Sequence, residues 1–382
     1  MYDVAGYGRM ISDRLRMDAY FEALRRTVNE RSVVLDIGTG TGIFALLACR
    51  LGARRVFAIE PSDAIQIARE NAAANGFTAR IDFIQDLSTN VTLPEKANIV
   101  VSDLRGVLPH FAKHLPVIRD ARQRLLSADA ILIPRRDDIC AAVVEAPALY
   151  RRYIEPWSHN DFGLNLLPGR RSIINAWRKG SVTQEQLLTA AHHLATIDYA
   201  TNEETDLHSQ VDFEVERPGV AHGLSVWFDS VLTDGVFMTN RPGEPELIYG
   251  QGFFPLFEPV TLVVGDVVSI TLSANLVGED YIWRWSTRVF SKGDPTGIKA
   301  DFSQSTFPGT PISAARLHKR SSKYVPRLNE EGEIKSYILS LFNGEMPLDE
   351  IARQLLKRFP ERFDDFNSAM TEVGRLSQDF SR

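Results

Sequence analysis

The sequence predicts an α/β protein of three parts: a Rossmann-like, doubly wound domain, an antiparallel β-barrel domain and a small helical domain. Three observations support this. Short apolar strands alternate with amphipathic helices up to Pro134, strand-like segments then follow without helices between them, and helical periodicity returns after residue 313. Alternating strands and helices are typical of a parallel sheet, whereas consecutive β-rich segments are typical of antiparallel sheets.

The first domain, residues 1–134, carries the alternating pattern. Residues 10–28 are expected to form one amphipathic helix. The expected strands cover 33–36, 56–59, 81–84, 99–102 and 131–133, and the expected helices between them cover 43–51, 64–75 and 118–126. A sheet of this kind binds its ligands at the C-terminal ends of the strands.

The second domain, residues 135–292, is rich in β-branched and aromatic residues. Its expected strands cover 139–144, 211–215, 224–232, 260–264, 267–274 and 281–290. Residues 187–194 are expected to form a short helix within this region, and 293–313 to be a linker rich in Gly, Pro, Ser and Thr. The third domain, 314–382, shows three helical stripes that can share one small core.

Composition restricts the classes of function. The chain has 382 residues, of which 44% are apolar and 24% charged, which suits two or three domains with apolar cores. A net charge of −6 without a long basic block indicates neither nucleic acid nor a membrane as partner. Two cysteines, Cys49 and Cys140, exclude a disulfide scaffold and a four-thiolate zinc site, and no metal is expected. Without a signal-like or spanning apolar segment, we expect a cytoplasmic protein.

The most informative stretch is VVLDIGTGTG, a short apolar strand followed by a glycine-rich turn. Gly38, Gly40 and Gly42 allow the backbone to come close to a ligand. Their spacing also fits a dinucleotide fingerprint. Asp36 favours S-adenosylmethionine, because its carboxylate would repel a pyrophosphate but suits the ammonium and sulfonium groups of that cofactor. Glu60, which ends the next strand, can accept both hydroxyls of a ribose.

These motifs resemble those of the protein arginine methyltransferases, and the resemblance covers about residues 2–290. Met10-Ile11-x-Asp13-x-x-Arg16, with Tyr20 after it, is similar to the helix that folds over the cofactor in that family. The resemblance implies that Arg16 holds the methionine carboxylate and that Ser88 and Thr89 contact the adenine. The residues expected to bind S-adenosylmethionine are therefore Met10, Arg16, Asp36, Gly38, Gly40, Gly42, Glu60, Ser88 and Thr89.

The resemblance also implies a homodimer, because the family dimerises through an arm that projects from its barrel. The segment 163–195 is where such an arm would leave this chain. It is rich in apolar residues, more than an isolated solvated loop would carry: Leu164, Leu166, Leu167, Ile173, Ile174, Trp177, Leu187 and Leu188.

The loop after the fourth strand, SDLRGVLPHFA, departs from the family pattern. The family clamps a guanidinium with two glutamates, and Asp103 and Ala112 stand at their places. We expect Asp103 to be a base or an orienting group and His110 to be a second candidate base, since an unperturbed imidazole titrates near pH ~6.5. Arg105 would oppose a cationic substrate, and either binds an anionic group or pairs with Asp103. The family's Thr-His-Trp loop is replaced by Gly250-Gln251-Gly252.

Together these features predict a methyltransferase that uses S-adenosylmethionine to methylate nitrogen or oxygen on a peptide or protein side chain, with arginine disfavoured. The C-terminal domain resembles PqqD-like domains that hold leader peptides, through ILSLFNG (338–344), Leu348–Ala352 and Phe359-Pro360. This implies recruitment of a peptide substrate. Two alternatives stay open: a small-molecule methyltransferase with a structural tail, and a catalytically weakened cofactor-binding scaffold.

Overall fold

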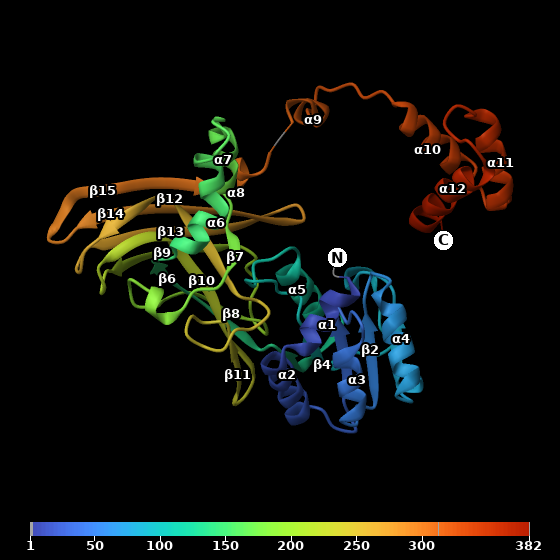
Figure 1. Ribbon diagram of the computed structural model, residues 1–382. Coiled ribbons are helices and arrows are strands. Elements are labelled where there is room, and N and C mark those ends of the chain that lie inside the picture. The colour runs from blue at the N-terminus through green and yellow to red at the C-terminus, as the bar shows by residue number, and fades with distance from the viewer. Residues whose placement is uncertain (1–2, 312, 382) are drawn as a thin grey trace. The chain divides into compact units, whose positions relative to one another are not determined.

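A computed structural model describes residues 3–311 and 313–381 of the chain (Figure 1). The chain divides into two compact units, and the boundary falls after Pro311. Residues 1, 2, 312 and 382, at the ends of the expected segments, lie outside the described residues.

The first unit begins with a parallel sheet in the order β3-β2-β1-β4-β5. The predicted alternation is confirmed, and all five residues of β1 are buried, as expected for a central parallel strand. The strands are β1 (Val33–Ile37), β2 (Arg55–Ile59), β3 (Ile81–Ile84), β4 (Ala97–Ser102) and β5 (Leu126–Ile133). They are connected by α3 (Ile43–Arg50), α4 (Ala64–Ala74), α5 (His114–Arg124) and the 3-10 turns η1 (Thr78–Arg80) and η2 (Ser88–Asn90).

The single helix expected over 10–28 is wrong, because two helices, α1 (Val4–Ser12) and α2 (Arg14–Thr27), meet at Asp13. Asp13 has extended backbone angles, and its Oδ1 accepts a hydrogen bond from the backbone N–H of Arg16 at 3.1 Å. An aspartate in this position stabilises the start of a new helix, so the chain turns here although the apolar pattern continues.

Two antiparallel sheets form the rest of the first unit, here called the β-domain. One has the order β7-β12-β10-β6-β8, with β11 on β10, and the other β15-β14-β13-β9. The first comprises β6 (Arg136–Val144), β7 (Arg178–Gly180), β8 (His192–Asp198), β10 (Gly219–Thr233), β11 (Val236–Thr239) and β12 (Gln251–Leu262). The second comprises β9 (Leu207–Glu214), β13 (Val267–Val277), β14 (Asp280–Ser291) and β15 (Asp294–Ser305). Trp283 and Trp285 are buried in its core.

Two expectations for this region are wrong. Residues 187–194 are not helical: the 3-10 turn η3 (Gln184–Gln186) precedes them, and β8 begins at His192 and pairs with β6. The expected linker contains β15, which pairs with β14, and the short helix α8 (Thr306–Gly309). Since β15 is an edge strand, its exposed face tolerates the polar residues that made it look like a linker.

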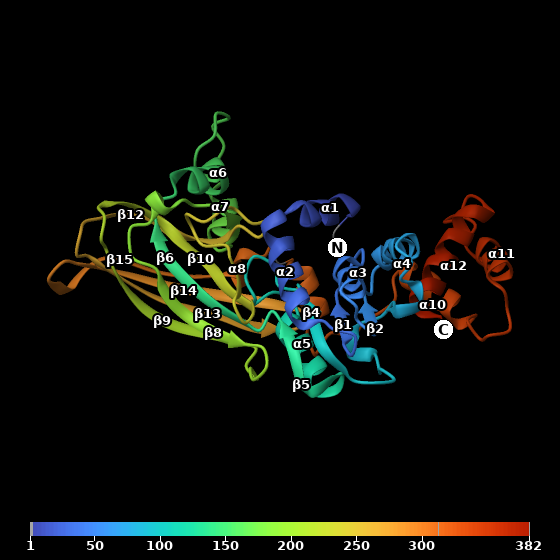
Figure 2. The same ribbon diagram turned by 90° about the horizontal axis from the view of Figure 1, so that it is seen from below.

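The segment 163–195, where a dimerisation arm is expected, begins in the turn between two helices, α6 (Pro147–Ser158) and α7 (Leu167–Ile174). Figure 2 shows this turn standing out from the sheets. The helices pack back on the β-domain, where Arg170 Nη2 donates to the carbonyl of Phe257 at 2.6 Å.

The second unit contains α9 (Ala314–Lys319), α10 (Glu330–Ser340), α11 (Leu348–Arg358) and α12 (Phe366–Phe380). The predicted three-helix core is confirmed, since Ile338, Leu355 and Val373 are fully buried in it. Residues 313–381 contain helices and no strand. In the described parts of the whole chain, no helix has both the length and the apolar character needed to cross a membrane.

Candidate active site

A cavity of about 390 Å³ lies at the C-terminal ends of β1, β2 and β4. This is the edge at which parallel sheets bind their ligands. Its lining comes from α1 and α2, the glycine turn, the segment after β2 and the loop after β4. Six predicted site residues line it: Met10, Arg16, Gly38, Glu60, Asp103 and Arg105.

The glycine turn has the predicted backbone. Gly38, Gly40 and Gly42 have φ angles of 76°, 55° and 89°, which side-chain-bearing residues rarely adopt. A Cβ atom on Gly40 would lie 2.3 Å from Cε1 of Tyr7, and one on Gly42 would lie 2.9 Å from Cβ of Ala68. Gly40 and Gly42 therefore shape the turn, while Gly38 faces the cavity.

Asp36, in β1, holds this turn through hydrogen bonds and does not line the cavity. Its Oδ2 accepts hydrogen bonds from Thr39 Oγ1 at 2.5 Å and from the N–H of Ala45 at 3.0 Å. Its Oδ1 is buried without a partner among the described residues. Burial raises the pKa of Asp36 from 3.8 to about 7. The expectation that Asp36 contacts the cationic groups of the cofactor is therefore not supported, because the carboxylate is buried beneath the turn.

Glu60 lines the cavity, and two backbone N–H groups hold its carboxylate. Oε2 accepts from the N–H of Gly40 at 3.1 Å, and Oε1 accepts from the N–H of Ser62 at 3.0 Å. Each oxygen keeps a further acceptor site for a hydroxyl. Ser62 also lines the cavity, and its hydroxyl is buried without a partner among the described residues. These groups fit a ribose diol.

The predicted adenine contacts do not line the cavity. Ser88 is buried in η2, where its carbonyl accepts from Arg124 Nη2 at 2.9 Å, and Thr89 is exposed. Met10 does line the cavity, and its carbonyl accepts from Arg16 Nη1 at 3.2 Å. The expectation for Ser88 and Thr89 is therefore not supported.

Asp103 is engaged by several donors. Its Oδ2 accepts from Nε and Nη2 of Arg16 at 2.8 and 2.6 Å, and from the hydroxyl of Tyr249 at 2.6 Å. Burial alone would raise the pKa of Asp103, but the guanidinium groups of Arg16 and Arg105 hold it below its usual value. The expectation that Asp103 acts as a base is therefore wrong, because an ionised carboxylate held in this way accepts protons poorly. Asp103 orients Arg16 instead.

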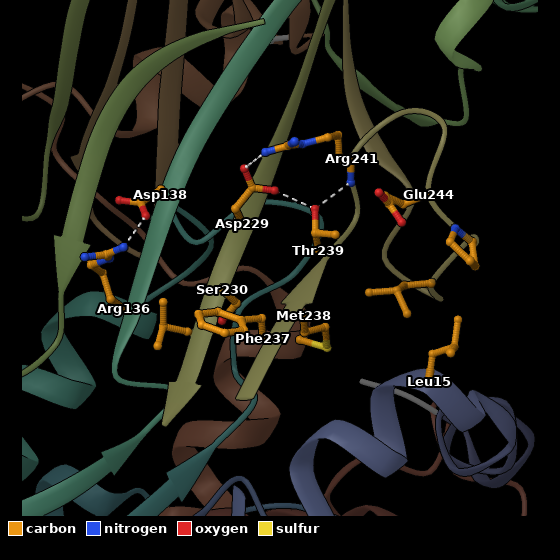
Figure 3. A pocket seen from close by; sticks show the side chains of 13 residues that line it. Leu15, Arg136, Asp138, Asp229, Ser230, Phe237, Met238, Thr239, Arg241 and Glu244 are labelled. Carbon is orange, nitrogen blue, oxygen red and sulfur yellow. Dashed lines mark hydrogen bonds and ion pairs between the residues drawn. The ribbon is translucent and has the colours of Figure 1, made fainter. Parts of the chain in front are cut away.

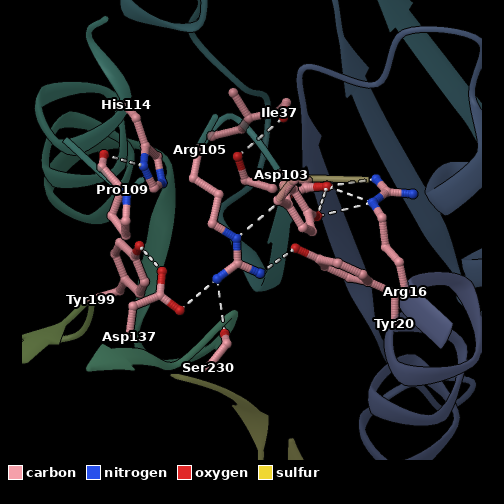
Figure 4. A network of polar contacts seen from close by, with 12 residues as sticks. Arg16, Tyr20, Ile37, Asp103, Arg105, Pro109, His114, Asp137, Tyr199 and Ser230 are labelled. Atoms are coloured by element: carbon pink, nitrogen blue, oxygen red, sulfur yellow. Dashed lines mark hydrogen bonds and ion pairs between the residues drawn. The ribbon is translucent and has the colours of Figure 1, made fainter. Parts of the chain in front are cut away.

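Arg105 lies at the centre of a buried polar network (Figure 4). Nη1 donates to Asp137 Oδ1 at 2.5 Å and to Ser230 Oγ at 2.8 Å, and Nη2 donates to the hydroxyl of Tyr20 at 3.0 Å. Nε lies 3.4 Å from Asp103 Oδ1, so the expected pair with Asp103 exists but is the longer contact. Because Asp137 pairs with this guanidinium, the expected opposition of Arg105 to a cationic substrate cannot come from an unpaired positive charge.

His110 does not line the cavity. Its ring packs against the rings of Tyr281 and Trp283, with centroids 5.4 and 6.0 Å away. Burial lowers the pKa of His110 to about 4. The prediction of His110 as a catalytic base is therefore wrong, and the residue belongs to the contact between the loop and the β-domain.

The segment Gly250-Gln251-Gly252 is structural. Gln251 accepts from the N–H of Val182 at 2.9 Å and donates to the carbonyl of Asn240 at 2.8 Å. The neighbouring residue Tyr249 supplies the hydroxyl that enters the site. Sequence reasoning did not assign this tyrosine to the site, and it also missed Tyr20, Asp137 and Ser230.

Comparisons with known proteins agree with the fold and the cavity. A family model described as ribosomal protein L11 methyltransferase (PrmA) matches residues 19–146. Histone-arginine methyltransferase CARMER of Anopheles gambiae is 26% identical over 283 residues, which are 70% of this chain and 45% of that protein. Probable histone-arginine methyltransferase CARM1 of Oryza sativa subsp. indica is 29% identical over 276 residues, 68% of this chain and 52% of that protein. The chain thus spans about half the length of the curated relatives it matches.

Solved structures show the same fold. The PRMT1 enzyme-prozyme heterotetrameric complex of Trypanosoma brucei with AdoHcy aligns with a TM-score of 0.70 at 24% identity, over 78% of this chain and 96% of that chain. Arabidopsis thaliana protein arginine methyltransferase 10 aligns with a TM-score of 0.68 at 22% identity, over 79% and 97%. The chain therefore has the fold of a class I methyltransferase similar to the protein arginine methyltransferases. S-adenosylmethionine is the cofactor that the family match and this cavity indicate.

Proposed function

We propose that this chain transfers a methyl group from S-adenosylmethionine to a nitrogen or oxygen atom of a peptide or protein side chain. That side chain is not arginine. One observation carries the proposal: Arg16, Glu60 and the glycine turn face a single cavity at the C-terminal edge of the sheet. When bound, the cofactor supplies an electrophilic methyl group on a sulfonium. The residues of this chain bind and orient it.

Each residue has a distinct task in this proposal. Glu60 would accept the ribose hydroxyls, and Arg16 would bind the methionine carboxylate while Asp103 fixes its guanidinium. Tyr7 and Met10 on α1 line the cavity and would exclude water from the reacting groups. Because Asp103 is fully engaged, the acceptor should be a nucleophile that already has a free lone pair.

Calorimetry tests the cofactor assignment. S-adenosylmethionine should bind more tightly than NAD, and the reverse order would contradict the proposal. Methyl-labelled cofactor incubated with cell lysate then tests the class of acceptor. Label in the protein fraction supports the proposal, whereas label only in the small-molecule fraction favours a small-molecule methyltransferase with a structural tail. Binding without any transfer favours a cofactor-binding scaffold.

We propose that the second unit recruits the substrate. It has its own buried core, and one face of α11 presents Lys357 and Arg358 next to Tyr337. Arg353 on the same face pairs with Asp349 and Glu350, so Lys357 and Arg358 are the basic groups that suit an acidic peptide segment. The double variant Lys357→Glu, Arg358→Glu should raise KM for the protein substrate and leave kcat unchanged. Ser336→Glu, on an exposed position of α10, serves as the matched control. Equal KM values in both variants would contradict recruitment by this face.

We also propose a homodimer in the cytoplasm. The turn between α6 and α7 exposes Phe162, Leu164 and Leu167, which are 83%, 60% and 54% accessible. Apolar groups gathered in this way on a projecting turn are typical of an interface. Light scattering at micromolar concentration should give a dimer mass, and Phe162→Ser with Leu164→Ser should give a monomer. A monomer of the unaltered chain would refute the dimer. The two free cysteines suit a reducing compartment.

A further inference from the structure

We propose that Arg105 is a specificity-determining residue whose guanidinium fills the position that a guanidinium acceptor would need. The inference deepens the proposed function and rests on it. It identifies the acceptor as an uncharged nitrogen or oxygen nucleophile, and it explains this choice by a side chain of the protein itself.

The surroundings of Arg105 form a complete guanidinium site. Two carboxylates, Asp103 and Asp137, and two hydroxyls, on Ser230 and Tyr20, accept hydrogen bonds from all three of its nitrogen atoms. The guanidinium carbon lies 4.6 Å from the ring centroid of Phe228 and 5.8 Å from that of Tyr249. Carboxylates in the plane and aromatic faces above it are the contacts that bind an arginine side chain specifically.

This site lies beside the cavity assigned to the cofactor, because Arg105 and Asp103 both line that cavity. A second cavity, of about 560 Å³, is lined by residues of β6, β10 and β11, of the segment 241–247 and by Leu15 (Figure 3). The carboxylates of Asp138 and Asp229 in its lining pair with Arg136 and Arg241. Ser230 lines this second cavity and accepts the hydrogen bond from Arg105. The bond therefore connects the linings of the two cavities. An acceptor that crossed from the second cavity to the cofactor would meet the guanidinium of Arg105.

The charged side chains around Arg105 already balance one another, so they offer no free carboxylate to a cationic acceptor. Arg16 and Arg105 face Asp103 and Asp137, so that two positive and two negative side chains balance. All four side chains are at least 90% buried. An incoming guanidinium would have to give up its hydration without gaining a free carboxylate, which is unfavourable.

A neutral acceptor avoids this cost. Its lone pair forms the new bond to the methyl carbon as the carbon–sulfur bond of the sulfonium breaks, and the cofactor leaves as an uncharged thioether. The acceptor then loses its proton to water. This step requires no carboxylate beyond those that already hold Arg16 and Arg105.

Guanidinium ion provides a test that does not depend on methyl transfer. In Arg105→Ala, guanidinium ion should bind in the place of the missing side chain. At about ten times the dissociation constant for this site, guanidinium chloride should raise the ratio of folded to unfolded protein about tenfold, while sodium chloride at the same concentration should not. Wild-type protein should show no such difference between the salts. The control variant Arg105→Ala, Asp137→Asn lacks one carboxylate of the site and should lose the effect.

If Arg105→Ala does not fold in sodium chloride, it is refolded with guanidinium at low millimolar concentration. Recovery of tertiary structure with guanidinium, and not with sodium, supports the proposal, whereas no recovery with either salt overturns it. In a second arm, wild-type protein should leave an arginine-rich peptide unmethylated while it labels its lysate substrate. Robust methylation of that peptide by the wild type overturns the proposal as well. Absence of cofactor binding would instead refute the proposed function and leave the guanidinium result unaffected.

Discussion

The glycine turn after β1 and the loop after β4 lie at the same edge of one sheet, but they are held in different ways. In the turn, Asp36 bonds to Thr39 and Ala45, three and nine residues away. In the loop, Arg105 bonds to Asp137 and Ser230, which lie 32 and 125 residues away. The turn is therefore fixed by its own neighbourhood in the sequence, while the loop takes its form from the β-domain.

The largest loss of stability should follow from removing Asp137, the carboxylate that pairs with Arg105 of the loop. Asp137→Ala leaves Arg105 charged and buried without its main partner, which typically lowers the free energy of unfolding by about 3–5 kcal/mol. Urea unfolding followed by tryptophan fluorescence measures this, and all five tryptophans lie in the first unit. The neighbouring variant Asp138→Ala, on a partly exposed ion pair, should cost about 1 kcal/mol or less. Equal losses would show that the loop does not depend on Asp137.

The glycine turn, unlike the loop after β4, should make the free energy of unfolding depend on pH through Asp36. The pKa of Asp36 is raised to about 7 in the folded state, so between pH 5 and 7 the folded protein holds a proton that the unfolded chain has released. The free energy of unfolding should therefore fall with rising pH over this window, by up to about 1.4 kcal/mol per pH unit, and level off above pH 7.

Asp36→Asn should remove this component, which urea unfolding without cofactor at pH 5, 6, 7 and 8 would reveal. Parallel pH profiles for the two proteins would mean that Asp36 does not titrate in this range. Because the side chain of Asp36 bonds to Thr39 and Ala45 and to none of the residues that hold Arg105, the variant should leave the guanidinium site of Arg105 intact.

A smaller change on the side of the loop is Tyr249→Phe. It removes the hydroxyl that joins Asp103 and Arg16, and a hydrogen bond to a charged group typically contributes about 1.5–3 kcal/mol. Urea unfolding should show a loss of this size. Tyr153→Phe, which removes a hydrogen bond in an exposed position, should show a much smaller one. Similar losses of stability in the two variants would show that the hydroxyl of Tyr249 does not stabilise the contact between Asp103 and Arg16.

The smallest predicted effect concerns ligand affinity. Glu60→Ala removes the acceptor for the ribose, and water will compensate in part, so calorimetry should show at least a tenfold loss of affinity for S-adenosylmethionine, or about 1.4 kcal/mol. Asp63→Ala changes a nearby exposed carboxylate and should leave affinity unchanged. An unaltered affinity in Glu60→Ala with an intact fold would remove the cofactor assignment.

This contrast explains what could be predicted from the sequence. The strands and helices of the parallel sheet were predicted closely, because their periodicity and turn residues are local signals. Glu60 and Gly38 were singled out from the same kind of local signal, and both line the cavity at the edge of the sheet. The partners of Arg105 could not be predicted, since nothing near residue 105 indicates that Asp137 and Ser230 come to lie beside it. Asp103 was misread because the three donors to its Oδ2 belong to Arg16 and Tyr249, which are distant in the sequence.

The same reasoning accounts for the errors in the β-domain. The polar character of 293–313 suggested a linker, but the segment forms β15 because β14 offers it an edge to pair with. The residues after 187 have an apolar spacing that suits a helix, yet β8 forms there because it can add to β6. Pairing with a distant strand decided both cases, and a single sequence carries no direct sign of it.

The break between α1 and α2 has a consequence for the order of events in a catalytic cycle. Asp13 caps α2 through Oδ1 and accepts the N–H of Ile248 through Oδ2 at 2.7 Å, so α2 is fastened to the segment that carries Tyr249. Helix α1, which brings Tyr7 and Met10 over the cavity, is joined to α2 through the carbonyl of Met10, which accepts from Arg16 Nη1 at 3.2 Å. The guanidinium expected to hold the carboxylate of the donor therefore also holds the helix that covers the cavity. We expect binding to be sequential for this reason, with the cofactor first and the acceptor second.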